Sequence, residues 1–560
     1  MSETVKYLIL ASSFLVLAIS FAIGLWAKKK VTSPEAFFGG AKIFGPLTVG
    51  LATMAAVGSA FAVVGVPGLV FSTGNTILLF MFAAPAFVFG YLVIGKKVRG
   101  MAEIGSVASL GDLADLRFNH HRGIKLMLSI MLFLGCAMYL SAQVEACAKL
   151  FENLFDWNPV VISVVIFAIL IAYTVLSGEI GGILTQAFQG LVIVLAGVIF
   201  IVSFFAVTGG FGPVLEAISG PQGTTAGLDP DAMTAWGSLP GAYSFAWVLL
   251  PTLGIMCQPQ VLTRMMMLRN PRDMPRLSIY ATCTNMVAGM MVMAVGYCAI
   301  YLAANGTVTI DHPDMAVFKV ADYLGLVAQL FVYPAVLAAA LSTSSLFLSL
   351  AGNIVSRDLP SSLGLTINPA RQMRVSRIAM SVMGISAIGF AGLSGDMVAI
   401  LGTYGFGTLA AATFPIFIIG LLWKGASSKG VMLGMLTALV STIAGVTIEI
   451  LKRFDLSSFT WPGGVPWYVF VLAASVVITI FASLLTQDDI LDEILSSIRV
   501  IDRRGTQLIE IEPVVICRTQ RDGDGRGTDE PGHRLVDGKA GIGHDDLIAR
   551  PDQGQHREGH

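Results

Sequence analysis

The segment Gly45-Pro-Leu-Thr-Val-Gly-Leu-Ala-Thr-Met-Ala-Ala-Val-Gly58-Ser59-Ala-Phe-Ala-Val-Val-Gly65-Val-Pro67-Gly68 is apolar along its length, yet it contains many residues that break helices. A run of about 20 apolar residues crosses a ~30 Å hydrocarbon core as a helix. Within lipid, an interrupted helix leaves unpaired backbone groups, so breaks are tolerated only where they line a cavity or are buried in protein. The segment therefore predicts a membrane helix that is interrupted near its centre.

The composition of the whole chain agrees with a membrane location. The 560 residues are 55% hydrophobic and only 13% charged, with a mean hydropathy of +0.76. A soluble domain carries roughly 25% charged residues. This composition excludes a soluble enzyme and a disordered chain, and the formal net charge of −1 argues against a nucleic-acid partner. We therefore predict an all-α polytopic membrane protein embedded in the lipid bilayer.

Apolar stretches of membrane-spanning length recur about thirteen times along the chain. They lie at 6–27, 46–71, 76–95, 123–148, 159–177, 183–206, 243–267, 277–304, 325–353, 374–395, 397–423, 430–451 and 465–485. Lys and Arg gather in alternate connections, such as 96–99, 264–276 and 371–377. Because cytoplasmic loops carry an excess of Lys and Arg, we expect the N-terminus outside and the C-terminus in the cytoplasm, with the protein in the cytoplasmic (inner) membrane.

The composition changes abruptly near Thr486, after which charged residues become frequent and aliphatic clusters rare. We interpret residues 1–485 as a transmembrane domain with core helices at about 45–423. A segment with few apolar residues cannot bury enough surface to offset its chain entropy. Residues 486–560 are therefore expected to form a disordered cytoplasmic tail.

Two other spans contain residues that break helices. The span 397–423 includes the cluster from Gly402 to Thr408, and the span 243–267 includes Pro251, Gly254 and Pro259. Interrupted helices in the two halves of a long membrane chain are typical of the binding site of a secondary transporter. Close packing of helices through small residues is the alternative, and we favour a site for the clusters taken together.

The ninth span contains the sharpest polar cluster, Ala338-Ala-Ala-Leu-Ser342-Thr343-Ser-Ser345. Hydroxyls, together with carbonyls freed by an unwound helix, are suitable ligands for a cation at mid-membrane. Ser342 and Thr343 would supply such ligands if they face the interrupted second span. The alternative is that these hydroxyls bond to carbonyls of their own helix.

Several segments resemble those of the sodium:solute symporter family. They are Gly39 to Gly74 (first core helix), Tyr173 to Gln189 (fifth), Gln258 to Arg264 (end of the sixth), Ala338 to Thr343 followed by Arg357-Asp-Leu359 (sodium-site helix) and Tyr404 to Pro415 (tenth). The resemblance covers most of residues 30–450. It implies a five-plus-five inverted repeat, in which spans two to six are related to spans seven to eleven.

The resemblance also implies an ion site and a solute site. The sodium ion would be bound by backbone oxygens of Ala55, Gly58 and Ala339 and by the hydroxyls of Ser342 and Thr343. Sodium is the expected coupling ion, with no other metal or cofactor. The residues expected to contact the solute are Ser59, Tyr139, Gln143, Ile255, Gln258 and Tyr404.

The implied function is cation-coupled symport that imports a small organic solute, such as a monocarboxylate or an amino acid. No catalytic residues are expected. The alternative is a transporter-like membrane sensor that signals solute availability to a partner kinase. The tail of about 75 residues after Leu485 has no kinase-like pattern, which argues against a kinase within this chain.

The chain departs from both family branches that it resembles. The proline-transporting branch has Asp where this chain has Val57 and Gln186, and its aromatic proline contacts correspond here to Pro251 and Ile255. This argues against proline as the solute. The segment from Tyr139 to Gln143 resembles the acetate and monocarboxylate branch, but that branch has Asp in its first core helix where this chain has Ala56.

Glu145 is an acidic residue well inside a predicted span of the first half. An intramembrane acid is by default a functional candidate. Lys149 follows four residues later on the same helix face, so an ordinary i,i+4 ion pair is an equal alternative.

Overall fold

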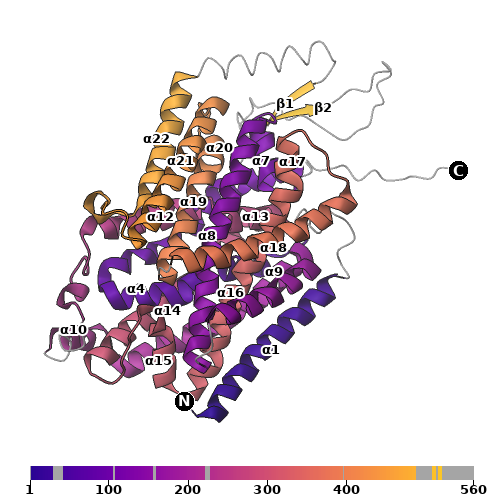
Figure 1. Ribbon diagram of the computed structural model, residues 1–560. Helices are drawn as coiled ribbons and strands as arrows, with labels where there is room; N and C mark the ends of the chain where they lie inside the picture. The colour runs from indigo at the N-terminus through magenta and orange to yellow at the C-terminus, as the bar shows by residue number, and fades with distance from the viewer. Residues whose placement is uncertain are drawn as a thin grey trace. The chain divides into compact units, whose positions relative to one another are not determined.

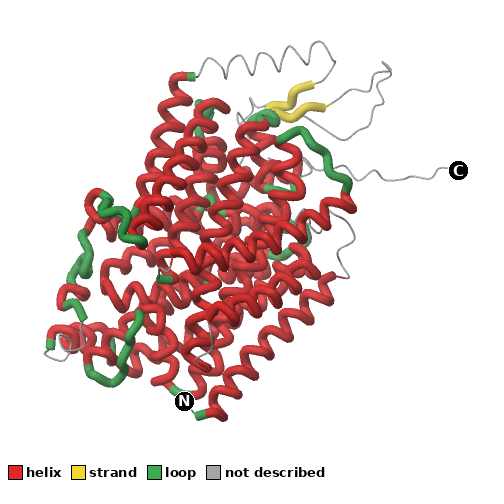
Figure 2. Tube along the Cα trace, viewed as in Figure 1, coloured by secondary structure: helices red, strands yellow, loops and turns green. Residues whose placement is uncertain are grey.

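The computed structural model describes residues 2–28, 42–104, 107–155, 159–220, 228–394, 397–486, 507–511 and 515–519. The chain divides into two compact units, Met1–Leu485 and Thr486–His560. The described residues of the first unit are predominantly helical (Figures 1 and 2). In the second unit, β1 (Gln507–Ile511) pairs antiparallel with β2 (Val515–Thr519). We did not predict these strands, and most of the tail expected to be disordered lies outside the described residues.

The helices of the first unit have the following bounds. In chain order they are α1 (Glu3–Lys28), α3 (Pro46–Val57), η1 (Phe61–Gly65), α4 (Val66–Thr73), η2 (Gly74–Phe82), α5 (Ala83–Phe89), η3 (Gly90–Gly95), α6 (Lys96–Ile104), α7 (Leu110–Arg117), α8 (Arg122–Phe155), α9 (Pro159–Thr208) and α10 (Phe211–Ser219). They continue with η4 (Pro230–Met233), α12 (Gly241–Ile255), α13 (Pro259–Met267), η5 (Pro271–Asp273), α14 (Met274–Ala304), η6 (Pro313–Met315), α15 (Ala316–Leu324), α16 (Leu326–Asn353), η7 (Ile354–Asp358), α17 (Leu359–Ser362), α18 (Pro369–Ser394), α19 (Val398–Phe414), η8 (Pro415–Ile419), α20 (Gly420–Leu422), α21 (Ser428–Arg453), η9 (Pro462–Gly464) and α22 (Trp467–Leu485).

Ten stretches of the described chain are long and apolar enough to cross a membrane, and α3 is a shorter apolar helix. The all-α polytopic class is therefore confirmed. The count of thirteen spans is not confirmed. The predicted spans 159–177 and 183–206 both fall within α9, of which Glu179–Thr208 is one of the ten stretches.

Two helices lie at the centre of the first unit. The most apolar window of the stretch Val398–Leu422 is 89% buried and that of Leu326–Ser362 is 78% buried, whereas that of Glu3–Ala27 is only 22% buried. A helix that is apolar all round and also buried belongs to the interior of a bundle. Figure 1 shows α1 along one edge of the bundle and the neighbouring helices α21 and α22 along another. The central helices α16 and α19 are thus placed to contact the interrupted segments.

The predicted interruption of the second span is present. Helix α3 ends at Val57, Gly58 and Ser59 are not helical, and the chain continues through the π-helix η1 into α4. Gly58 has φ −72° and ψ 50°, outside the helical region. The span at 243–267 is also interrupted, between α12 and α13 at residues 256–258. Pro259 begins α13, where its missing N–H costs no helical hydrogen bond.

The prediction of a break between Gly402 and Thr408 was wrong. Helix α19 runs without interruption through this cluster. Its glycines instead permit close contacts, because a Cβ atom on Gly405 would lie 2.4 Å from the backbone nitrogen of Tyr139 and one on Gly402 would lie 2.3 Å from the ring of Phe61. Here the small residues serve helix packing.

Candidate functional site

The end of α3 meets the polar cluster of α16. The Ser342 hydroxyl donates to the carbonyl of Ala55 at 2.7 Å and lies 2.9 Å from the carbonyl of Ala339. The Thr343 hydroxyl lies 3.2 Å from the carbonyl of Ala56. These side chains are fully buried. Because α3 ends at Val57, its last carbonyls have no partner in their own helix. Carbonyl and hydroxyl oxygens from α3 and α16 therefore converge.

Four of the five predicted ion-site residues lie in this cluster: Ala55, Ala339, Ser342 and Thr343. The fifth, Gly58, lies in the break itself, and its N–H donates to the carbonyl of Met54 at 2.6 Å. Ala56 was not predicted. The sequence feature that could have indicated Ala56 is the pair of adjacent hydroxyls on α16. In the structure, these hydroxyls contact two successive carbonyls of α3. Neutral oxygens of this kind suit a hard cation that has lost its water.

A buried hydrogen-bonded chain lies directly behind the cluster. The amide nitrogen Nε2 of Gln186 on α9 donates to the carbonyl of Ser342 at 3.0 Å and lies 3.2 Å from the Ser345 hydroxyl. The amide oxygen of Gln186 accepts from the Arg264 guanidinium on α13. Arg264 also pairs with the Glu179 carboxylate, with an N–O distance of 2.6 Å. This series of hydrogen bonds links α16, α9 and α13.

Gln186 was predicted to lie in the fifth core helix, and neither Arg264 nor Glu179 was predicted as a site residue. Both are buried, with side-chain exposures of 0% and 9%. The signal was available, since each is a charged residue within or next to an apolar stretch. Charged groups at membrane depth usually pair with one another and usually mark a functional pathway.

The predicted solute residues of the first half lie together at the break. The Ser59 hydroxyl is 3.1 Å from the Tyr139 hydroxyl, and the N–H of Ala60 donates to the Gln143 amide oxygen at 3.0 Å. The Tyr139 ring also contacts the Phe347 ring, with centroids 4.9 Å apart. Helix α8 therefore presents two polar side chains to the start of η1 and α4, the second half of the interrupted helix.

The second interruption carries Ile255 and Gln258. Ile255 is buried at the end of α12, and Gln258 is the last residue before α13. The Gln258 amide nitrogen donates to the carbonyl of Phe406 on α19 at 2.9 Å. Its amide oxygen is buried without a hydrogen-bond partner among the described residues. Gln258 thus retains an unused acceptor next to the break.

Tyr404 lies apart from the other predicted solute residues. Its ring contacts Trp467 and Tyr468 of α22, with centroid distances of 5.4 and 6.3 Å. The next residue, Gly405, lies against Tyr139. Because adjacent residues of a helix point in different directions, Tyr404 is directed toward α22 rather than toward the break.

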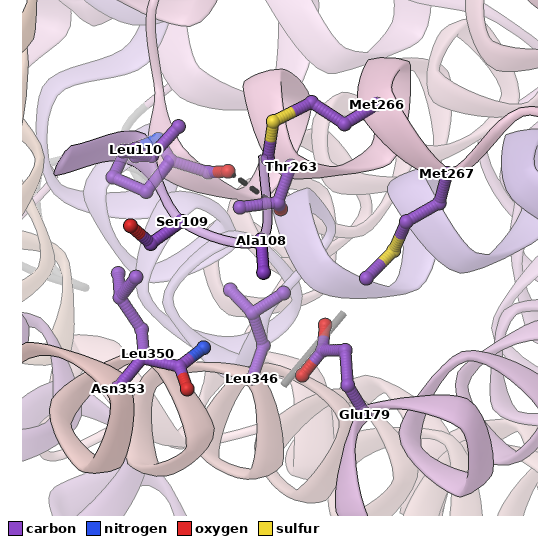
Figure 3. A pocket seen from close by; sticks show the side chains of 11 residues that line it. Ala108, Ser109, Leu110, Glu179, Thr263, Met266, Met267, Leu346, Leu350 and Asn353 are labelled. Atoms are coloured by element: carbon purple, nitrogen blue, oxygen red, sulfur yellow. Dashed lines mark hydrogen bonds between the residues drawn. The ribbon is translucent and has the colours of Figure 1, made fainter. Parts of the chain in front are cut away.

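A small pocket lies farther along α16, between the segment before α7, α9 and α13. Leu346 and Leu350 line it, one and two turns beyond Ser342 on the same face of α16. Figure 3 shows the carboxylate of Glu179 and the amide of Asn353 projecting from their helices into the same space. A cavity volume of about 20 Å³ holds a water molecule but no organic solute. The pocket therefore fits water or a small ion.

Charged side chains form ion pairs and hydrogen bonds just beyond this end of α16. Arg357 pairs with Asp112 of α7 at 3.0 Å, and Ser109 donates to the Asp358 carboxylate at 2.6 Å. Lys125 of α8 pairs with Asp115 at 2.7 Å. Helix α7 is thereby tied both to the end of α16 and to the beginning of α8.

Glu145 forms an ion pair with Lys149, which was one of the two interpretations of this acidic residue. Its carboxylate is 3.9 Å from the Lys149 ammonium, which is also 3.1 Å from Glu152. The Glu145 side chain is 28% exposed. The i,i+4 interpretation therefore has direct geometric support.

Comparison with known proteins places this geometry in a family. The model of the sodium:solute symporter family matches residues 37–438. Sodium/proline symporter 2 of Staphylococcus saprophyticus is 26% identical over 484 residues, which cover 83% of this chain and 90% of that protein. The osmoregulated proline transporter OpuE of Bacillus subtilis is 21% identical over 463 residues, covering 82% and 91%.

A solved structure shows the same fold. The outward-open, substrate-bound structure of a Na⁺-coupled sialic acid symporter superposes with a TM-score of 0.65 at 17% identity, covering 85% of this chain and 98% of that one. The family and these relatives are multi-pass transporters of the cell membrane, which confirms both the resemblance and the expectation that the chain is not an enzyme. The chain belongs to the sodium:solute symporter family, whose members couple sodium to the transport of small solutes.

Proposed function

We propose that this chain is a sodium-driven symporter that imports a small organic solute, such as a monocarboxylate or an amino acid, across the cytoplasmic membrane. The observation that carries the proposal is the contact between the interrupted helix and α16. There, the hydroxyls of Ser342 and Thr343 meet the freed carbonyls of Ala55 and Ala56. Family membership supports sodium as the coupled ion.

We propose that the sodium site comprises backbone oxygens of Ala55, Gly58 and Ala339 and the hydroxyls of Ser342 and Thr343. Bound sodium supplies a positive charge that attracts oxygens of both α3 and α16. In this structure the Ser342 hydroxyl joins the same two helices by hydrogen bonds. The carboxyl end of a helix also favours a cation, because its unpaired carbonyls carry partial negative charge. The end of α3 therefore suits sodium on electrostatic grounds.

The other side of the break suits a carboxylate. The outer half of the interrupted helix begins next to Ser59, and helix N-termini favour negative charge. Tyr139, Gln143 and Gln258 add neutral polar groups around it. We propose that these residues, together with Ile255, bind the solute through its carboxylate. Tyr404 is left out of this group because it packs on α22.

The relatives named above are proline symporters. In this chain, the positions expected to be aromatic proline contacts are Pro251 and Ile255. The side chains of Pro251 and Ile255 cannot stack on the ring of a proline solute as an aromatic side chain would. We therefore propose a carboxylate solute other than proline.

The proposed architecture is a five-plus-five inverted repeat. It is supported by the two interruptions, one between α3 and α4 and one between α12 and α13. We further propose that the N-terminus is outside and the C-terminus in the cytoplasm, on the basis of the loop charges. On this orientation, α3 and α13 are the inner halves and α4 and α12 the outer halves of the interrupted helices.

Uptake by the full-length chain in proteoliposomes tests the function. Labelled acetate, alanine and proline would be offered with an inward sodium gradient, or with sodium replaced by choline, at fixed membrane potential. We expect acetate or alanine to accumulate only with sodium. Binding of a probe without accumulation in either medium would contradict symport and would instead fit a sensor.

The ion site is tested by the double variant Ser342→Ala, Thr343→Ala. We expect the sodium concentration for half-maximal uptake to rise at least about tenfold, because two oxygens are lost from the site. The control is Ser344→Ala on the same helix, which is also buried and is expected to transport normally. A double variant with unaltered sodium dependence would show that the ion binds elsewhere.

A further inference from the structure

Asp314 is a buried carboxylate outside the membrane-spanning stretches. It lies in η6, in the connection between α14 and α15. Its relative exposure is 0%. One carboxylate oxygen, Oδ2, accepts the N–H of Val398, the first residue of α19, at 3.0 Å. The other, Oδ1, is buried without a hydrogen-bond partner among the described residues.

The segment around Asp314 is packed tightly between the outer half of the interrupted helix and α19. A Cβ atom on Gly68 of α4 would lie 2.6 Å from the carbonyl of Pro313, and one on Gly65 would lie 2.4 Å from the backbone nitrogen of Ala399. Because backbone meets backbone at both contacts, η6, α4 and the start of α19 form one block. Asp314 is the side chain that joins η6 to α19 within it.

No cation is in hydrogen-bond contact with the Asp314 carboxylate in the described part of the chain. The nearest ionisable side chain is His312, whose Nδ1 lies 3.8 Å from Oδ2. Burial, with help from the Lys149 charge, lowers the pKa of His312 below its ordinary value. His312 is therefore neutral at pH 7 and does not compensate an ionised Asp314.

Two helices packed against η6, α8 and α15, carry other charged groups. Glu145 and Lys149 on α8 act on Asp314 in opposite directions, and α15 carries Lys319 and Asp322. Neither η1 nor α4 contains a titratable residue. Burial raises the pKa of Asp314 to about 7, although the Val398 N–H opposes this shift.

We propose that Asp314 is a proton-binding site that latches the outer half of the interrupted helix to α19. With a proton bound, the carboxyl group stays buried and η6 holds α4 and α19 together. Without the proton, an uncompensated charge lies in an apolar block and favours separation of η6 from α19. The proposal concerns the face predicted to be outside, and it does not depend on which ion or solute is transported.

The direction of the pH effect follows from linkage. An Asp314 exposed to water by separation has an ordinary pKa near 4, roughly three units below the value of about 7 in the packed block. The packed state therefore binds more protons between these two values. Raising the pH from about 4 to about 7 progressively weakens the latch, and a further rise above about 8 has little additional effect.

The variant Val398→Cys reports on separation of η6 from α19, since Val398 is fully buried. Its labelling rate by a membrane-impermeant methanethiosulfonate would be measured from pH 5.5 to 8.5 on the full-length chain. The rate would be divided by that of Thr307→Cys in the exposed loop before η6. Labelling of the chain without either added cysteine would be subtracted, because the chain has native cysteines.

We expect the rate ratio to rise about thirtyfold across this range, with its midpoint near pH 7. In an Asp314→Asn background, which keeps an oxygen for the Val398 N–H, the ratio should stay low and flat. Asp311→Asn removes an exposed carboxylate three residues away and should leave the pH dependence unchanged. His312→Gln should also leave it unchanged.

Three outcomes would overturn the proposal. They are a flat ratio in the chain that retains Asp314, a pH dependence that survives Asp314→Asn, and one that disappears with His312→Gln. The thermal midpoint of the purified chains provides a reading without introduced cysteines. The midpoint of the natural chain should fall relative to that of Asp314→Asn as the pH rises from 5.5 to 8. A constant difference would likewise count against a proton site.

Discussion

Arg264 is a charged residue buried among the membrane helices. It is a fully buried guanidinium in a membrane protein, held between the Glu179 carboxylate and the Gln186 amide. Gln186 in turn donates to the carbonyl of Ser342. The Glu179 carboxylate thus balances the charge of Arg264. The neutral Gln186 amide connects Arg264 to the proposed sodium site through hydrogen bonds. An acid at position 186 would instead place negative charge beside that site.

The pairing of Arg264 with Glu179 predicts a non-additive effect on stability. Arg264→Met leaves a buried carboxylate without its partner, which costs about 3–5 kcal/mol. Adding Glu179→Gln removes that charge, so the double variant should recover most of the lost stability. Thermal unfolding of the full-length chain in detergent measures both effects. Arg374→Met, at an exposed position of α18, serves as the control and should change little.

A double variant no more stable than Arg264→Met would show that the pair does not account for the loss. Sodium dependence of uptake is the second reading. Because Gln186 retains its bonds to Ser342 and Ser345 in the double variant, its half-maximal sodium concentration should change less than about threefold. A larger change would assign Arg264 a direct role at the ion site.

A local sequence pattern was enough to select Ser342 and Thr343, which the structure brings together with Ala55 and Ala56. Ser342 and Thr343 are adjacent, and their spacing to Arg357 carried the resemblance. Arg264 and Glu179 are 85 positions apart, and nothing in a single sequence indicates that they meet. Hydropathy also conceals them, since one charge hardly alters the mean over a 20-residue window.

Among the helices, α19 shows how glycines determine packing. One side of it contacts α8 through Gly405, and another contacts α22 through Gly407, where a Cβ atom would lie 2.6 Å from Tyr468. A third contact is with α12, where Gly254 lies against Phe406. Because three helices approach α19 so closely, a change in one contact is expected to shift the others.

Gly405→Ala therefore predicts a loss of both stability and transport. Its added methyl group would meet the backbone of Tyr139, which cannot move without displacing α8. Overpacking of this kind costs about 1–3 kcal/mol. The displacement also separates the Tyr139 hydroxyl from Ser59, so uptake should fall more than about tenfold. Thermal unfolding and sodium-driven uptake of the same preparation measure the two effects.

The matched control is Gly389→Ala in α18, where a Cβ atom would have nothing within 4 Å. Alanine is the better helix former by about 1 kcal/mol, so this variant should be as stable as the natural chain or slightly more stable. Equal effects of the two substitutions would mean that loss of glycine itself, rather than the contact with Tyr139, is responsible.

The sequence could not separate helix breaks from packing contacts by composition. Gly58 and Gly405 both lie in glycine-rich apolar stretches, yet only Gly58 is in a break. What distinguishes them is tertiary. The carbonyls freed near Gly58 meet the hydroxyls of α16, whereas the surroundings of Gly405 are the backbone of α8. Within the span 243–267, the break ends at Pro259, whereas Pro251 and Gly254 lie inside the continuous helix α12.

In the molecule as a whole, hydropathy was sufficient for the class and insufficient for the count of spans. Charge depletion combined with apolar runs of about 20 residues is explained by a lipid environment. Counting spans also requires knowing where each helix begins and ends, and α9 and the interrupted helices do not follow the hydropathy windows. The change of composition near Thr486 coincides with the boundary between the two compact units.

That boundary predicts that the first unit folds and transports without the second. The family match ends at residue 438, and α22, the last helix among the described residues, ends at Leu485. A chain truncated after Thr486 keeps every described helix, so its thermal midpoint should remain within about 2 °C of the full-length value. Its sodium-driven uptake should remain within about twofold.

A chain truncated after Gly464 is the control, because it also loses α22. Ser475 of α22 donates to the carbonyl of Ala411 and Trp467 packs on Tyr404, so this shorter chain should aggregate on extraction. Loss of folding in the longer truncation would instead show that residues after Thr486 are required for the stability of the membrane unit.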